Sequence, residues 1–306
     1  MLRSVILAAS RSSRVEHMVE TAPITRAIVR RFVAGSGIED ALRATRELLA
    51  QGLAVTIDYL GEDTLTAAQA EAVRDEYLAL LAALSSAGHT PAAEVSVKLS
   101  ALGHRFDEEL AYRHARAICA AAAEAGTTVT LDMEDHTTTD ATLEILGRLR
   151  QDFPTTGGVL QAYLRRTEAD CRELATDGSR IRLCKGAYRE PESVAYQAAI
   201  DVAKSYVRCL NILMSAPGYP MIATHDPRLI AIAAERARWL GRSPQEFEFQ
   251  MLYGVRPEEQ IRLVREGYTV RVYVPYGTDW YGYLMRRLAE RPANLMFFAR
   301  ALRSRR

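Results

Sequence analysis

Two hydrophobic patterns alternate along most of the chain, and together they predict parallel strands separated by helices. Short runs of β-branched and other apolar residues, typical of strands buried on both faces, alternate with longer stretches whose apolar residues recur at helical spacing. Strands are predicted at residues 55–60, 95–99, 129–133, 158–163, 180–184, 221–224, 247–251 and 268–273. Helices are predicted at residues 66–88, 107–125, 139–150, 168–175, 192–215, 228–240, 257–265 and 280–302. This regular alternation in a chain of 306 residues favours an α/β fold, a closed (βα)8 barrel of the TIM type.

The first 52 residues precede this alternation and predict a helical arm. Apolar residues from Ile28 to Leu49 recur at helical spacing, and Gly52 is a suitable stop. We therefore expect an N-terminal helical arm at residues 1–52 and a barrel at residues 53–306. The competing architecture, an open doubly wound sheet, normally carries a glycine-rich turn after its first strand. The first strand is followed here by the sequence LGED, which lacks that glycine pattern.

Composition and charge argue against several classes of protein. The chain has 39 lysine and arginine residues against 38 aspartate and glutamate residues, so its net charge of +1 provides no field that would attract nucleic acid. Its four cysteines are far apart and form no metal-binding pattern, as expected of a reduced, cytosolic protein without a structural metal. The apolar run at residues 5–9 is too short for an export signal, and no run reaches the roughly 20 apolar residues of a membrane-spanning helix. We therefore expect a soluble protein.

Polar side chains concentrate near the carboxyl ends of the predicted strands. In barrels of this type those ends and the loops after them form the active site, whereas the residues below are packed. This rule selects Asp58, Lys98, Asp132, Glu134, Asp135, Gln161, Arg182, Lys185, Thr224, His225, Gln250, Arg271 and Tyr273. Each also has a structural interpretation, as a helix cap, a turn residue or a surface side chain. Lys98 and Arg182 are harder to explain in that way, because a cation in a buried strand needs an anionic partner.

The last predicted helix carries four polar residues on one face. Tyr283, Arg286, Arg287 and Glu290 are related by offsets of three, four and seven. One interpretation is a solvated charged face with an arginine–glutamate pair. The other is a fork of two arginines that binds a carboxylate or phosphate through paired hydrogen bonds. The pattern alone does not separate the two.

The kind of chemistry is indicated mainly by what is missing. The chain contains no nucleophile elbow, P-loop or zinc-protease motif. A cavity rich in charged and aromatic side chains but without a nucleophile suggests that a bound cofactor performs the chemistry. Two other hypotheses stay open: an aldolase-type barrel with Lys98 or Lys185 as a Schiff-base nucleophile, and a barrel that serves only as a non-catalytic subunit.

Eight motifs in a fixed order make the chain resemble the bacterial monofunctional proline dehydrogenases, a family of flavin-dependent (βα)8 barrels. The resemblance runs from about residue 30 to the carboxyl terminus. The motifs are VKLSAL at residues 97–102, LDME at 131–134, LQAY at 160–163, RLCKGAY at 182–188, ATHD at 223–226, FEFQMLYG at 247–254, VYVPYG at 272–277, and the polar face of the last helix.

The resemblance implies a reaction and its partners. The substrate would be L-proline, oxidised to pyrroline-5-carboxylate with FAD as the hydride acceptor, and a quinone at the membrane would then take the electrons. The enzyme would be cytoplasmic and at most peripheral to the inner face of the membrane. A separate pyrroline-5-carboxylate dehydrogenase would consume the product, because the sequence shows no aldehyde dehydrogenase domain.

The resemblance also implies roles for individual residues. The expected catalytic residues are Arg182, at the N5 and O4 edge of the flavin, and Asp132, as a negative partner for the surrounding cations. The expected substrate-binding residues are Lys98, Arg286 and Arg287 at the proline carboxylate, and Tyr188, Tyr273 and Tyr283 around the ring. The expected FAD-binding residues are Met133, Gln161, Lys185, Gly186, Ala187, Thr224, His225 and Glu290, the last also a tether for Arg287 or a neighbour. The last helix is expected over the barrel mouth, and Tyr273 is expected to favour unsubstituted proline over hydroxyproline.

Overall fold

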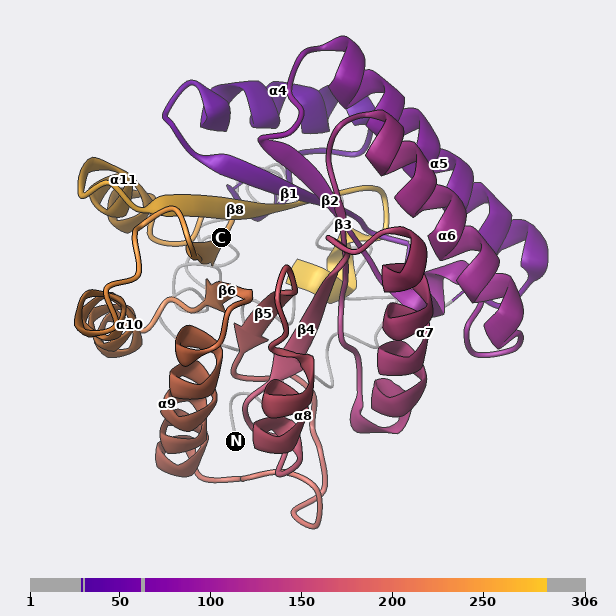
Figure 1. Cartoon of the computed structure of the whole chain (residues 1–306). Helices are drawn as coiled ribbons and strands as arrows, with labels where there is room; N and C mark the ends of the chain where they lie inside the picture. The colour runs from indigo at the N-terminus through magenta and orange to yellow at the C-terminus, as the bar shows by residue number, and fades with distance from the viewer. Residues whose placement is uncertain (1–28, 30, 62–63, 285–306) are drawn as a thin grey trace, which may run out of the picture.

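The computed structural model describes residue 29, residues 31–61 and residues 64–284, and it shows a closed barrel (Figure 1). Eight parallel strands are hydrogen-bonded in sequence order, and the last pairs with the first. The strands are β1 (Ala54–Tyr59), β2 (Ala93–Val97), β3 (Val129–Leu131), β4 (Gly157–Gln161), β5 (Arg180–Cys184), β6 (Tyr219–Ala223), β7 (Glu248–Leu252) and β8 (Thr269–Tyr276). This topology confirms the predicted fold class.

Helices cover the outside of the barrel (Figure 1). They are α4 (Ile38–Leu49), α5 (Ala67–Ser86), α6 (Glu108–Glu124), α7 (Thr139–Asp152), α8 (Thr167–Leu174), α9 (Ala199–Ser215), α10 (Pro227–Trp239) and α11 (Pro257–Arg265), with short 3-10 turns η1 (Leu99–Leu102) and η2 (His136–Thr138). From α5 to α11, the predicted bounds of the α-helices hold to within a few residues except for α9.

Helix α9 begins seven residues later than the helical pattern predicts, because the preceding segment is bound elsewhere. The backbone N–H of Tyr163 donates to the carbonyl of Lys185, and the N–H of Tyr196 donates to the carbonyl of Tyr163. These contacts hold the chain before α9 in an irregular loop over the end of β4. Local periodicity could not show this, since the competing partner is distant in the sequence.

Helix α5 shows how local sequence sets an element boundary. The Thr66 hydroxyl accepts a hydrogen bond from the backbone N–H of Gln69, and the side-chain oxygen of Gln69 accepts one from the backbone N–H of Thr66. This is a capping box, which satisfies backbone donors that the first turn leaves unpaired and fits the start predicted for this helix at residue 66.

Helix α4 packs against β1 and β8 (Figure 1), with Ala41, Ala44 and Leu48 buried. The described part of the predicted arm therefore belongs to the outer layer of the barrel. Residues 1–28 lie outside the described residues, and the division at residue 52 stays a prediction.

The barrel has an apolar outer face and a polar interior. Val55, Ile57, Val95 and Val97 are fully buried in the apolar core between strands and helices. The residues that alternate with them carry polar groups that contact one another inside the barrel, such as the hydroxyl of Thr56 on β1 and the carboxylate of Glu94 on the adjacent strand β2, at 2.9 Å. Buried polar groups of this kind require partners, and the paired layers inside the barrel provide them.

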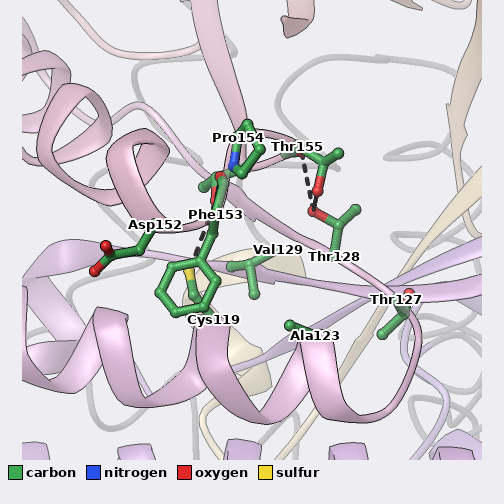
Figure 2. Close-up of a pocket in the computed structure, with 10 residues that line it drawn as sticks. Cys119, Ala123, Thr127, Thr128, Val129, Asp152, Phe153, Pro154 and Thr155 are labelled. Atoms are coloured by element: carbon green, nitrogen blue, oxygen red, sulfur yellow. Dashed lines mark hydrogen bonds between the residues drawn. The ribbon is translucent and has the colours of Figure 1, made fainter. Parts of the chain in front are cut away.

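A small pocket lies at the amino-terminal end of the barrel, between α6 and the starts of β3 and β4 (Figure 2). Cys119, Val129 and Phe153 are among its lining residues, and the Cys119 thiol lies 3.9 Å from the Thr156 hydroxyl. The predicted active site is at the other end of the strands. No helix in the part of the chain that the structure describes is long and apolar enough to cross a membrane.

Candidate active site

Two buried ion pairs lie side by side near the carboxyl ends of the strands. The ammonium of Lys98, directly after β2, donates to both carboxylate oxygens of Asp58 on β1, at 2.7 and 2.9 Å. Arg182 on β5 binds Asp132, directly after β3, with 2.5 Å between NH1 and Oδ1. Asp132 Oδ2 lies 3.7 Å from the Lys98 ammonium, so it links the two pairs.

These contacts confirm that the two buried cations have anionic partners. The carboxylate that neutralises Lys98, however, differs from the one expected from the sequence. Asp132 was expected to balance the cations as a group, whereas Asp58 is the nearer carboxylate for Lys98. Asp58 is 1% exposed, and an ionised carboxylate so deeply buried requires the Lys98 charge beside it. The strand-end rule selected Asp58, yet the family-based role assignment omitted it.

Tyr273 on β8 completes this group. Its hydroxyl donates to Asp132 Oδ2 at 2.6 Å and lies 3.5 Å from the Lys98 ammonium. Burial, with the Asp132 and Asp58 charges, raises the pKa of the Tyr273 phenol well above its ordinary value. The phenol therefore stays protonated and acts as a fixed donor. The Arg182 guanidinium lies 5.3 Å from the centre of the same ring.

Two buried polar atoms on adjacent strands have no hydrogen-bond partner among the described residues. Arg182 uses Nε for Gln250 Oε1 and NH1 for Ser96 and Asp132, which leaves NH2 unpaired. Gln161, the last residue of β4, donates to the carbonyl of Glu134 at 3.0 Å, while its Oε1 accepts nothing. Because such atoms are costly to bury unpaired, a donor and an acceptor left open here indicate a place for a polar ligand.

Three of the predicted cofactor-binding residues lie in or contact the loop after β6, through one side-chain ion pair and two backbone N–H donors. Asp226 caps α10 and also binds the Lys185 ammonium at 2.9 Å, and its N–H donates to the Thr224 hydroxyl at 3.1 Å. His225 Nε2 accepts from the N–H of Leu252 at the end of β7, at 2.9 Å. Lys185, Thr224 and His225 are therefore brought together at the ends of β5 and β6.

The loop after β5 is built around one aromatic ring. Gly186 has a φ of +105°, and a Cβ there would lie 2.3 Å from a ring carbon of Tyr163. Beyond it, Glu190 accepts from the Tyr163 hydroxyl at 3.1 Å and from the N–H of His136 at 3.0 Å, and it also contacts the His136 ring. The bracket made by Tyr163, Glu190 and His136 positions the segment that carries Ala187 and Tyr188. Glu190 and His136 could not be identified from the sequence, because their contacts arise only between loops.

A second charged layer lies below the ion pairs, one step down the strands. Glu94 binds Arg180 at 2.7 Å, and Arg271 binds Glu248 through Nε at 2.9 and 3.1 Å. Arg271 was selected as a strand-end residue, and that expectation is wrong. Strand β8 continues five residues beyond it to Tyr276, so its side chain lies in the lower layer and donates to backbone carbonyls at the starts of β1 and β2.

The structure describes only some of the remaining predicted residues. Met133 and Tyr283 are buried, at 7% and 6% exposure. Arg286, Arg287 and Glu290 lie outside the described residues, as does most of the last predicted helix. Within residues 31–61 and 64–284, no three His, Cys, Asp or Glu side chains are grouped as a metal ion would require.

Known proteins resemble this chain both in sequence and in structure. The family model "Proline dehydrogenase" matches residues 41–300. "Proline dehydrogenase 1" of Bacillus subtilis is 40% identical over 302 residues, which cover 99% of each chain, and "Proline dehydrogenase" of Deinococcus radiodurans is 42% identical over 90% of each chain. A crystal structure of proline utilization A from Bdellovibrio bacteriovorus, inactivated by N-propargylglycine, superposes with a TM-score of 0.81 at 27% identity. That match covers 86% of this chain and 32% of the longer one. The chain therefore belongs to the proline dehydrogenase family.

Proposed function

We propose that this proline dehydrogenase oxidises L-proline to pyrroline-5-carboxylate with FAD as its hydride acceptor, and that a quinone then reoxidises the flavin. The observation that carries this proposal is the pair of open hydrogen-bonding atoms at the barrel mouth, Arg182 NH2 and Gln161 Oε1. They lie on adjacent strands, β5 and β4, inside a site that otherwise satisfies its buried charges.

The donor set at these strand ends fits a flavin. An isoalloxazine edge offers both acceptors and an N–H donor, which matches an open guanidinium nitrogen beside an open amide oxygen. When bound, FAD would supply the hydride acceptor for the oxidation of proline. The fixed positive charge of Arg182 would favour the reduced form of a flavin held there, because reduction adds negative charge to the ring. Lys185, Thr224 and His225, with Gly186 and Ala187 directly after Lys185 and Met133 after β3, would hold the rest of the cofactor.

The chain's own residues bind and orient the substrate. Among the described residues of the upper layer, the charges of Asp58 and Asp132 formally balance those of Lys98 and Arg182. A substrate carboxylate in contact with the Lys98 ammonium therefore needs further positive charge. The pair Arg286 and Arg287, with its planar guanidinium groups, would supply it. Tyr273, held by Asp132, would form one wall for the proline ring, together with Tyr188 and Tyr283.

The geometry argues against a Schiff-base aldolase. Such a mechanism requires a neutral lysine amine as the nucleophile. The Lys98 nitrogen instead donates to both oxygens of a buried carboxylate, which favours the charged ammonium. The family membership and this ion pair therefore both support the dehydrogenase.

The proposal extends to the setting of the reaction. Because quinones are dissolved in the membrane, the enzyme would act in the cytoplasm at the inner face of the membrane, and a separate dehydrogenase would consume pyrroline-5-carboxylate.

The test is an anaerobic reduction experiment on the purified chain. We expect a protein with flavin absorbance that L-proline bleaches without oxygen and that a soluble quinone restores. D-proline serves as the matched control, since it has the same groups in the opposite arrangement. A protein that purifies without flavin and does not bind added FAD contradicts the cofactor assignment, and bleaching by both enantiomers contradicts the substrate site.

A further inference from the structure

The orientation of Arg182 depends on a residue that the reaction proposed above does not use. Its guanidinium is planar and is held at two of its three nitrogens. Nε is held by Gln250 Oε1 at 2.5 Å, and NH1 is held by Asp132 Oδ1 at 2.5 Å and by the Ser96 hydroxyl at 3.1 Å. Two anchors on different nitrogens fix the plane and the rotation of a guanidinium, whereas one anchor leaves it free to pivot. The direction of the open nitrogen NH2 is therefore set jointly by the partners of NH1, Asp132 and Ser96, and by Gln250 at Nε.

Gln250 can hold Arg182 in this way only with its amide in one orientation. Its Oε1 accepts from Arg182, and its Nε2 donates to Glu248 Oε1 at 2.5 Å. A rotated amide would place its NH2 group against the N–H of Arg182 and its oxygen against the carboxylate of Glu248. Both contacts would be repulsive in a buried site, since Gln250 is 4% exposed.

Glu248 is itself fixed as an acceptor. Arg271 donates to both of its oxygens at 2.9 and 3.1 Å, and Glu248 is fully buried. Burial alone raises the pKa of the Glu248 carboxyl, but the Arg271 and Arg180 charges outweigh burial and hold that pKa below its ordinary value. An ionised carboxylate offers no proton, so it can only accept from Gln250.

We propose that Gln250 is a positioning residue for proline oxidation, and that Glu248 orients its amide so that Arg182 directs NH2 toward the redox cofactor. The inference rests on the proposed function, because it concerns the alignment of Arg182 with a bound flavin. Neither Gln250 nor Glu248 touches the substrate in this assignment. Without Gln250 the positive charge of Arg182 remains, but the second anchor of the guanidinium is lost.

The decisive variant is Gln250→Met, which keeps a side chain of similar length and removes the acceptor. We expect it to retain FAD and to bind proline with a KM close to that of the unaltered enzyme, because Asp58, Lys98 and Tyr273 keep their contacts. The flavin should become harder to reduce, with an equilibrium constant for reduction about tenfold lower, which a two-electron couple reports as a midpoint about 30 mV more negative. The kcat should fall about tenfold as well.

A matched control is Gln260→Met. Gln260 is equally buried, at 2% exposure, and its amide donates to two backbone carbonyls of the loop after β7, away from Arg182. We expect it to lose stability without a shift in flavin potential. A second variant, Glu248→Gln, leaves Gln250 in place but removes the carboxylate that orients it, and it should shift the potential in the same direction as Gln250→Met.

The outcomes distinguish this inference from the proposed function. If the unaltered chain binds no flavin, the proposed function fails. If the unaltered chain binds flavin but Gln250→Met keeps its potential and kcat within twofold, loses FAD, or shifts no more than Gln260→Met, the positioning role is refuted while the proposed function stands. Should Gln250→Met not fold, the potential of Glu248→Gln decides, and an unchanged value overturns the inference.

Discussion

The ion pair between Asp58 and Lys98 gives the sharpest test of the site's energetics. Asp58→Asn keeps the shape of the side chain but removes the negative charge that both hydrogen bonds of 2.7 and 2.9 Å depend on. Removing one partner of a buried ion pair costs about 3–5 kcal/mol, because the other charge stays buried without compensation. Lys98 retains Asp132 Oδ2 at 3.7 Å as a second, more distant carboxylate. We therefore expect a loss near the lower limit, about 3 kcal/mol.

The measurement is urea unfolding of the purified protein, analysed as a double-mutant cycle with Asp58→Asn, Lys98→Met and the double variant. Because the two side chains share one interaction, the double variant should lose much less than the sum of the single losses, with a coupling of about 2 kcal/mol. Thr45→Val serves as a buried control, since Thr45 is fully buried in α4, away from the ion pair. Additive losses, or a loss below about 1 kcal/mol for Asp58→Asn, would refute the idea that this pair is the main electrostatic contact of Lys98.

Three further outcomes follow from individual positions. Gly186→Ala should destabilise the protein more than Gly178→Ala, by about 1–3 kcal/mol in thermal unfolding. Both glycines have positive φ, but only at Gly186 would the new Cβ meet the Tyr163 ring. Equal losses would contradict the idea that the loop after β5 is packed around that ring. Glu94→Gln should cost about 3 kcal/mol in urea unfolding, since it leaves Arg180 without the carboxylate it binds while Arg271 keeps Glu248, and a neutral result would show that the pair of Glu94 and Arg180 is dispensable. Burial raises the pKa of the Cys184 thiol to about 11, so its alkylation, followed by mass spectrometry, should be slow at pH 7 and accelerate about tenfold per pH unit up to that value; a plateau near pH 9 would contradict it.

The elements and their order could be predicted from the sequence because their causes are local. Short apolar runs, helical periodicity and the capping box at Thr66 each depend on neighbouring residues. The start of α9 could not be predicted, because a residue of its first predicted turns, Tyr196, is bound to Tyr163 in the distant loop after β4.

The sequence predicted most of the side chains that meet inside the barrel, but not which of them bind one another. A rule based on strand ends selected Asp58, Lys98, Asp132, Arg182, Gln250 and Tyr273, all of which meet inside the barrel. The same rule misplaced Arg271, since the depth of a side chain depends on how far its strand continues. It did not select Glu94 or Glu248, which lie at the middle or start of their strands and are matched with arginines only by the closed register.

The sequence by itself determined the strands, the helices, the barrel and the residue types available at its mouth, because each follows from short-range periodicity and from the direction in which parallel strands end. Only the tertiary structure decided which carboxylate neutralises which cation. Asp58 and Lys98 are 40 positions apart, and Asp132 and Arg182 are 50 apart. Their partnership is set by barrel closure and by the need to satisfy every buried charge at once, a condition that applies to the assembled interior and not to any single segment.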